Sequence, residues 1–279
     1  MRIGVTSDIH TDISPGNSQI IKHIAEAVKE AELDVFIICG DISANVMVFS
    51  RTLGAFHHID SDCKKLLVAG NHDIWTSQTT GKIDSNDKYK LITAIASEHD
   101  FHHLGDSPVI IDKIGFCGTI GWYDYSYRND KHNIPIKYYM KKFFQGSVWN
   151  DVNYAKWGKS DIEMARYFEN ELQNQINSIK NGVSRIIAVT HHVPFKECVK
   201  YKDKLPWDFF SAFMGSVGLG EICLKEPLIT HALFGHTHAN FNVNIKGVQA
   251  VCSPVGYLTD PPKSLSQYAR QKLHIIDIA

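Results

Sequence analysis

Five short polar motifs, each directly after an apolar run, are the strongest constraint on how this chain can fold. In chain order they are Asp8-Ile9-His10, Gly40-Asp41, Gly70-Asn71-His72-Asp73, His191-His192 and Gly235-His236-Thr237-His238. In open α/β sheets, ligands bind at the carboxyl ends of the strands, where such side chains can gather at one edge. The motifs therefore predict an α/β protein whose polar site is built from segments far apart in the sequence.

The apolar runs alternate with helical patterns along much of the chain. Strands are predicted at 2–6, 34–38, 64–69, 184–190, 229–234, 241–245, 248–252 and 273–278, with a hairpin at 109–112 and 114–118. Helices are predicted at 18–31, 46–59, 89–98 and 159–180, and a loop at 76–88. This alternation indicates a parallel sheet with crossover helices. Since no repeat or low-complexity linker interrupts it, we expect one domain over residues 1–279.

Composition excludes several classes of protein. A chain of 279 residues can bury roughly 70–75% of its unfolded surface, so it needs no disulfide or metal merely to fold. Its 29 lysines and arginines against 30 aspartates and glutamates give a net charge of −1. That balance argues against bulk attraction to nucleic acid or anionic lipid, so nucleic acid is a possible partner that the charge does not indicate.

The cysteines and the N-terminal sequence bear on the compartment. No two of the six cysteines are closer than 24 residues, which excludes a CxxC pair and favours buried free thiols. Free thiols fit a reducing compartment. We find neither a signal peptide nor a stretch of 18 apolar residues, and expect a cytoplasmic protein without a membrane span.

The motif residues suit metal binding. Asp8 and His10 are two residues apart, as are His236 and His238, and in extended chain that spacing directs both side chains to one side. Carboxylate, imidazole and amide oxygen without thiolate match manganese, iron or zinc. Seven candidate ligands are too many for one tetrahedral ion, but two ions that share Asp41 would each have four. The candidates are Asp8, His10, Asp41, Asn71, His191, His236 and His238.

The chain has 15 histidines, and most lie outside these motifs. We interpret His192 as facing the pocket because it follows a candidate ligand. The remaining ones are expected to be ordinary surface or core residues: His23, His57, His58, His99, His102, His103, His132, His231 and His274.

The five motifs, in this order, resemble the signature of the calcineurin-like metallophosphoesterase superfamily, in a bacterial-type form. The resemblance implies an α/β fold of four layers, an α/β/β/α sandwich with two mixed β-sheets flanked by helices. It implies two metals, the first held by Asp8, His10, Asp41 and His238 and the second by Asp41, Asn71, His191 and His236. A metal-bound hydroxide would attack phosphorus in line. His72 would assist the leaving group, and Asp73 would orient its neighbours.

The residues after Gly40-Asp41 narrow the activity. The serine/threonine phosphatase branch of the superfamily has Asp-Arg there, whereas this chain has Ile42-Ser43-Ala44-Asn45. The arginine that binds phosphate in that branch is therefore absent from this position, which disfavours a phosphoprotein phosphatase. We expect a phosphodiesterase acting on a small phosphoester or nucleotide-like substrate. The alternatives are a phosphomonoesterase, a nucleotidase, a nuclease, or a binding scaffold without activity.

An aromatic and basic segment at about 121–157 shows no clean periodicity. It is either a small satellite core that covers the sheet or a cap over the metal cleft. Basic residues interleaved with aromatic ones suit a phosphate and a stacked base. As a cap, the segment would place Trp122, Tyr123 and Arg128 in the substrate cleft, and the basic stretch 196–204 could form the opposite rim.

Overall fold

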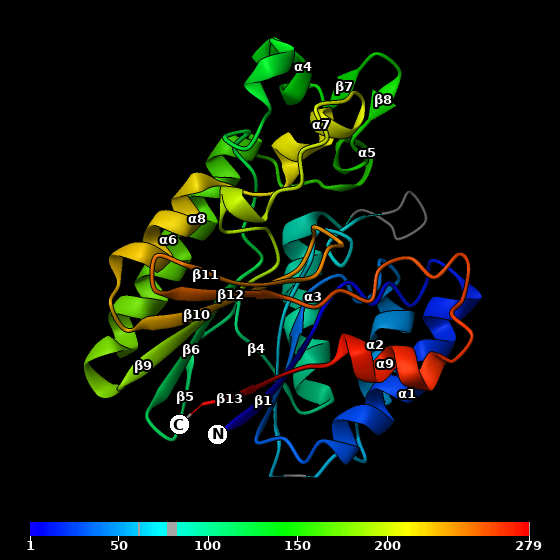
Figure 1. Ribbon diagram of the computed structural model, residues 1–279, viewed down its shortest axis with the longest axis vertical. Helices are drawn as coiled ribbons and strands as arrows, with labels where there is room; N and C mark the ends of the chain where they lie inside the picture. The colour runs from blue at the N-terminus through cyan, green and yellow to red at the C-terminus, as the bar shows by residue number, and fades with distance from the viewer. Residues whose placement is uncertain (61, 77–82, 279) are drawn as a thin grey trace.

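The computed structural model describes residues 1–60, 62–76 and 83–278, and shows two large β-sheets packed together with helices on their outer faces (Figure 1). The first sheet has the strand order β13-β1-β2-β3-β4, and the second has the order β11-β12-β10-β9-β6-β5. Both sheets contain parallel and antiparallel pairs. The predicted sandwich of two mixed sheets flanked by helices is confirmed.

With the exception of β4, the strands of the two large sheets fall close to the predicted ranges. Those of the first sheet are β1 (Arg2–Thr6), β2 (Val35–Cys39), β3 (Lys64–Val68), β4 (Phe101–His103) and β13 (His274–Asp277). Those of the second are β5 (Val109–Ile111), β6 (Ile114–Thr119), β9 (Arg185–Thr190), β10 (Ile229–Phe234), β11 (Phe241–Ile245) and β12 (Val248–Cys252). A separate small hairpin consists of β7 (Phe143–Phe144) and β8 (Ser147–Val148).

Helices cover the outer face of each sheet. Next to the first sheet lie α1 (Pro15–Glu30), α2 (Val46–Gly54), α3 (Ser85–Glu98) and α9 (Leu265–Lys272). The second sheet is covered by α6 (Asp161–Ile179) and α8 (Val217–Lys225). Beyond one end of the sheets lie α4 (Ile136–Met140), α5 (Asp151–Tyr154) and α7 (Trp207–Phe210), together with the small hairpin (Figure 1).

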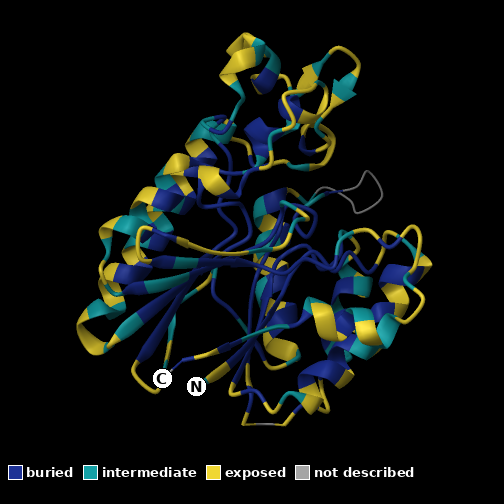
Figure 2. Cartoon of the chain, viewed as in Figure 1, coloured by how far each residue is buried: buried dark blue, intermediate teal, exposed yellow. Residues whose placement is uncertain are grey.

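Alternation of side chains explains why the central strands read as unbroken apolar runs. In β2, Val35, Ile37 and Cys39 pack between the two sheets. Phe36 and Ile38 point to the opposite face and pack under the helices. Successive side chains of a strand point to opposite faces, and here both faces are covered, so no position of the strand needs to be polar. The buried strands stand out in Figure 2.

Some boundaries differ from the prediction. Helix α3 begins at Ser85 rather than 89, because the Asp84 side chain accepts a hydrogen bond from the Asp87 N–H and caps the helix. The helix predicted over 46–59 ends at Gly54. Strand β4 and helices α8 and α9 were not predicted. Part of the predicted loop 76–88, residues 77–82, lies outside the described residues.

All six cysteines are free and buried, as predicted. Within the described part of the chain, no helix is both long enough and apolar enough to cross a membrane.

Candidate metal centre

The candidate ligands lie on loops that leave the carboxyl ends of five strands from both sheets. Asp8 and His10 follow β1, Asp41 follows β2, and Asn71 follows β3. From the second sheet, His191 follows β9, while His236 and His238 follow β10. The two sheets thus bring ligands from both ends of the chain to one place, as the strand pattern predicts.

Five of these residues have left-handed backbone, including all four of the paired motifs, which were expected to be extended. The φ angles are 52° at Asp8, 49° at His10, 56° at Asp41, 70° at His236 and 50° at His238. The argument from extended-chain spacing is therefore wrong. The turned backbone directs His236 and His238 into two different ligand groups, although they are only two residues apart.

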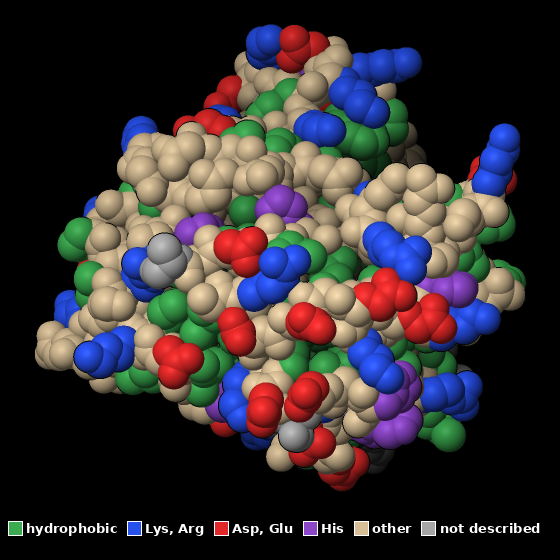
Figure 3. Space-filling model, turned by 60° about the horizontal axis from the view of Figure 1, so that its bottom comes forward, with side chains coloured by type: hydrophobic (Ala, Val, Ile, Leu, Met, Phe, Trp, Pro, Cys, Tyr) green, Lys and Arg blue, Asp and Glu red, His purple; other side chains and the backbone are tan. Residues whose placement is uncertain are grey.

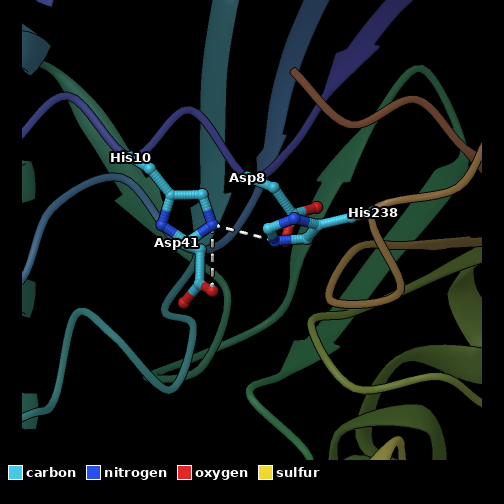
Figure 4. Close-up of side chains that lie close together, drawn as sticks. All are labelled: Asp8, His10, Asp41 and His238. Atoms are coloured by element: carbon cyan, nitrogen blue, oxygen red, sulfur yellow. Dashed lines mark hydrogen bonds and ion pairs between the residues drawn. The ribbon is translucent and has the colours of Figure 1, made fainter. Parts of the chain in front are cut away.

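The first group consists of Asp8, His10, Asp41 and His238 (Figure 4). One ligand atom from each lies within 4.8 Å of all the others. The Nε2 atoms of His10 and His238 are 3.0 Å apart. His10 Nε2 lies 3.6 Å from Asp41 Oδ2, and His238 Nε2 lies 3.4 Å from Asp8 Oδ1.

The second group consists of Asp41, His191 and His236, with Asn71 beside them. His191 Nε2 is 3.1 Å from both Asn71 Oδ1 and His236 Nδ1, and 3.4 Å from Asp41 Oδ1. The two oxygens of Asp41 therefore face different groups. Asp41 is therefore placed where one carboxylate could be shared between two ions.

Glycine is needed where these loops touch. A Cβ atom on Gly70 would lie 2.2 Å from Asp41 Oδ1 and 2.3 Å from the Asp41 backbone nitrogen. Gly40 has a φ of +82°, and a Cβ there would lie 2.5 Å from His191 Nδ1. The close approach of loops that brings the ligands together thus depends on missing side chains.

Asp8 and His10 of the first group are held in the forms that bind a cation, whereas Asp8 raises the pKa of His238 against the effect of burial. Burial opposes ionisation of Asp8, but the hydrogen bond and charge of His238 outweigh it and lower its pKa to about 2. Burial lowers the pKa of His10 to about 3, so its imidazole is neutral near pH 7. Carboxylates and neutral imidazoles are the forms that bind metal ions.

In the second group, burial opposes ionisation of Asp41, but the charges of His191 and His72 hold its pKa well below the usual range. Burial also opposes protonation of His191, yet Asp41 raises its pKa to about 9. Burial holds the pKa of His236 well below its ordinary value. Without an ion, the positive charge of protonated His191 balances the negative charge of the carboxylates, and a bound cation would displace that proton. The donor set therefore fits metal ions.

Asp73 ties the ligand loops together. Its Oδ1 accepts hydrogen bonds from the Ile42 and Ser43 N–H groups at 2.8 Å each, and its Oδ2 accepts one from the Gly70 N–H at 2.8 Å. Burial, together with the charge of Asp41, raises its pKa to about 7. Asp73 thus braces the loops of Asp41 and Asn71 and does not line the cavity described next.

A cavity of about 260 Å³ opens on the metal centre. On its inner side lie Asp41, Asn71, His72, His236 and His238. The remaining walls are mainly apolar and aromatic, and consist of Trp149, Val199, Lys200, Trp207, Phe210, Ser211, Met214, Thr237 and Tyr257. His72 lies between the ligand side of the cavity and its aromatic wall. Its backbone N–H donates to Asp41 Oδ1 at 2.8 Å, and its ring stacks on that of Trp75 with centroids 3.7 Å apart.

The structure does not place Trp122, Tyr123 or Arg128 at this cavity, which corrects the expectation that they line the cleft. Trp122 and Tyr123 are fully buried, because their rings stack on each other and their polar ends donate to Asp161 and Asp151. Arg128 lines a separate surface hollow and pairs with Asp130 at 2.9 Å.

His192 is also fully buried and lies behind His236, with ring centroids 4.4 Å apart, rather than in the cavity. Burial, with the charge of His191, lowers its pKa to about 3.

Three other members of the two segments predicted to flank the cleft do reach the cavity. Trp149 comes from the 121–157 segment, and Val199 and Lys200 come from the 196–204 stretch. Phe210, Met214, Tyr257 and the buried Asp151 were not predicted, because no period or motif distinguishes them from other aromatic, apolar or acidic residues of the chain.

Comparisons with known proteins agree with this geometry. A family model described as calcineurin-like phosphoesterase matches residues 1–240. No curated protein matches the sequence significantly. A phosphopantetheinyl hydrolase of Mycobacterium tuberculosis has a TM-score of 0.74 at 16% identity, covering 94% of this chain and 93% of that chain.

Two further solved structures share the fold. A protein of Thermus thermophilus has a TM-score of 0.55 at 12% identity, covering 99% of this chain and 98% of that one. A dimetal phosphatase of Danio rerio has a TM-score of 0.51 at 13% identity, covering 90% of this chain and 86% of that one.

Proposed function

This chain belongs to the calcineurin-like phosphoesterase family and is a metal-dependent phosphoester hydrolase. We propose that its preferred substrates are small phosphodiesters. The alternatives are phosphomonoesters, including nucleotides, and nucleic-acid phosphates.

The character of the cavity wall carries this proposal. Among the cavity residues, all of which lie in the described part of the chain, Lys200 is the one lysine or arginine. A phosphomonoester carries close to two negative charges near neutral pH, because its second pKa is about 6. A phosphodiester carries one, and its second substituent needs a surface to lie against. The aromatic side chains of Trp149, Trp207 and Phe210 offer that surface.

The metal ligands are proposed to form two sites that share Asp41. Asp8, His10, Asp41 and His238 would hold one ion, and Asp41, Asn71, His191 and His236 the other. Bound ions would supply positive charge to the phosphoryl oxygens and lower the pKa of a water molecule. Manganese, iron and zinc all fit these ligands.

His72 is proposed as the catalytic residue that assists the leaving group. It lines the cavity beside Asp41, and stacking on Trp75 fixes the plane of its ring. From this place an imidazole N–H can donate a proton or a hydrogen bond to the departing oxygen. Attack would come from the opposite side of phosphorus, in line with that oxygen. Asp73 supports this geometry through the loops it braces.

Small substrates are favoured over nucleic acid by the size of the cavity and by the surface charge. On the face shown in Figure 3, basic and acidic side chains are interspersed, in keeping with the net charge of −1. Nucleic-acid binding relies mainly on clustered positive charge. The six free buried thiols support a reducing compartment, and we propose the cytoplasm.

A comparison of mono- and diester substrates tests the proposal. With manganese, we expect kcat/KM on bis(p-nitrophenyl) phosphate to exceed that on p-nitrophenyl phosphate at least tenfold. His236→Ala should abolish hydrolysis of both, which controls for a contaminating enzyme. A preference for the monoester would refute the diester assignment, and metal-free, inactive protein would favour a binding scaffold. A phosphopantetheinyl ester belongs in the follow-up panel, since a hydrolase named for that group shares the fold.

A further inference from the structure

Asp151, at the start of α5, is a buried carboxylate that receives four hydrogen bonds. It is 1% exposed. Its Oδ1 accepts from Asn71 Nδ2 at 3.0 Å and from Trp75 Nε1 at 2.6 Å. Its Oδ2 accepts from the Tyr123 hydroxyl at 2.9 Å and from Trp149 Nε1 at 2.7 Å. The four donors use the whole accepting capacity of an ionised carboxylate.

These contacts decide which end of the Asn71 amide faces the metal centre. An ionised carboxylate can only accept hydrogen bonds, so the NH₂ group of Asn71 has to face Asp151. The amide oxygen then points the other way and lies 3.1 Å from His191 Nε2. Oxygen is the atom of an amide that binds a metal ion, and a flipped amide would present NH₂ instead.

The same carboxylate also holds two tryptophans, one that stacks on His72 and one that lines the cavity. Trp75, whose indole N–H is held by Asp151, stacks on His72 with an interplanar angle of 26°. Trp149, held by the other oxygen, lines the cavity. Asp151 of the 121–157 segment therefore contacts three side chains in or beside the candidate site, those of Asn71, Trp75 and Trp149.

We propose that Asp151 is a positioning residue that makes Asn71 present its oxygen to the second metal ion and that seats Trp75 against His72. The proposal rests on the proposed function only in taking Asn71 as a ligand. It gives the 121–157 segment a direct part in building the metal centre, beyond covering the sheet.

Metal binding in the absence of substrate tests this directly. Metal-free protein is titrated with Mn²⁺ by isothermal calorimetry, with folding checked by thermal unfolding. The wild type should bind two ions. Asp151→Asn keeps the shape but not the four acceptor sites, so the affinity of the second site should fall roughly 10–100-fold while that of the first is unchanged. Tyr123→Phe removes one hydrogen bond from the oxygen that does not touch Asn71, and should leave both affinities unchanged.

A rescue variant separates positioning from general stability. In Asn71→Asp combined with Asp151→Asn, the carboxylate at 71 can face the new NH₂ group with one oxygen and the ion with the other. Second-site affinity should recover at least tenfold over Asp151→Asn. If Asp151→Asn does not fold, the double variant decides alone, and a folded double variant without second-site binding overturns the proposal.

Equal weakening of both sites, or of neither, in Asp151→Asn also overturns it. Since no substrate enters this experiment, a wrong substrate assignment leaves the result unaffected.

Discussion

Gly70→Ala probes the tightest contact in the metal centre. The new Cβ would meet the Oδ1 and backbone nitrogen of Asp41 at 2.2 and 2.3 Å, where ordinary contacts begin near 3.4 Å. One of the two loops has to move by about 1 Å. Asp41 cannot rotate away freely, because Oδ1 accepts the His72 N–H at 2.8 Å and faces His191. The strain therefore falls on the carboxylate between the two ligand groups.

The expected size of the effect follows from this geometry. Overpacking a well-packed interior costs about 1–3 kcal/mol. At roughly 2–4 °C per kcal/mol for a chain of this size, Tm should fall by about 2–12 °C. A misplacement of about 1 Å near reacting groups can cost about 10²-fold in rate. Because Asp41 faces both groups, both metal affinities should weaken.

Thermal unfolding of metal-free protein and calorimetric titration with Mn²⁺ measure the two effects separately. Gly182→Ala is the matched control, since its Cβ would have its nearest neighbour, Ile110 Cδ1, at 3.9 Å. The control should keep the Tm and both affinities of the wild type. Two ions bound to Gly70→Ala with wild-type affinity and unchanged Tm would refute the role assigned to this contact.

Three further substitutions and the removal of metal test the site and its surroundings. His72→Asn should lower kcat by about 10²–10⁴-fold at unchanged metal content, and loss of metal would contradict its catalytic role. Asp41→Asn should abolish hydrolysis and lose at least one ion in metal analysis, and retained activity would exclude a bridging carboxylate. Lys88 is buried beside the site, and its Nζ donates to the carbonyl oxygens of Ala44 and Trp75. Burial lowers the pKa of Lys88 to about 8 from 10.5, so the unfolded chain binds the extra proton between these values and stability rises with pH in that window. The unfolding free energy of the wild type should therefore gain up to about 3 kcal/mol over Lys88→Met from pH 8 to 10.5 in denaturant titrations, and a constant difference would contradict this. Removal of metal by a chelator should lower Tm, and Mn²⁺ at 100 times its Kd should restore about 2.7 kcal/mol of unfolding free energy. A Tm unaffected by metal would exclude binding to the folded state.

The position of the candidate ligands was predictable because each lies where a strand ends. An apolar run such as 34–38 followed by Gly40-Asp41 indicates both a buried strand and the polar loop after it. The parallel order of the strands then brings the loops to one side. The left-handed backbone at Asp8 or His238 leaves no such mark, because aspartate and histidine also occur in extended chain.

The 121–157 segment was not predictable, because its organisation depends on where the hydrogen-bond partners of its aromatic side chains lie in the fold. A buried indole N–H needs an acceptor. For Trp122 that acceptor is Asp161, 39 residues further on, so the ring lies in the core. For Trp149 it is Asp151, close to the centre, so the ring lies at the cavity. The side chain and its need for an acceptor are the same in both cases, and the three-dimensional position of the acceptor distinguishes them.

The backbone of the ligand loops indicates why such a site needs the support it has. Left-handed conformation costs an ordinary residue roughly 1–2 kcal/mol, and five candidate ligands adopt it. Aspartate and histidine tolerate this conformation better than bulky residues, so the ligand types also suit their backbone. The remaining strain is held by fixed acceptors, since Asp73 takes three backbone N–H groups and both oxygens of Asp8 take the His236 N–H, at 2.9 and 3.1 Å. These buried carboxylates therefore maintain the ligand geometry before any ion binds, and removal of the Asp73 carboxylate should weaken metal binding although no ligand atom is lost.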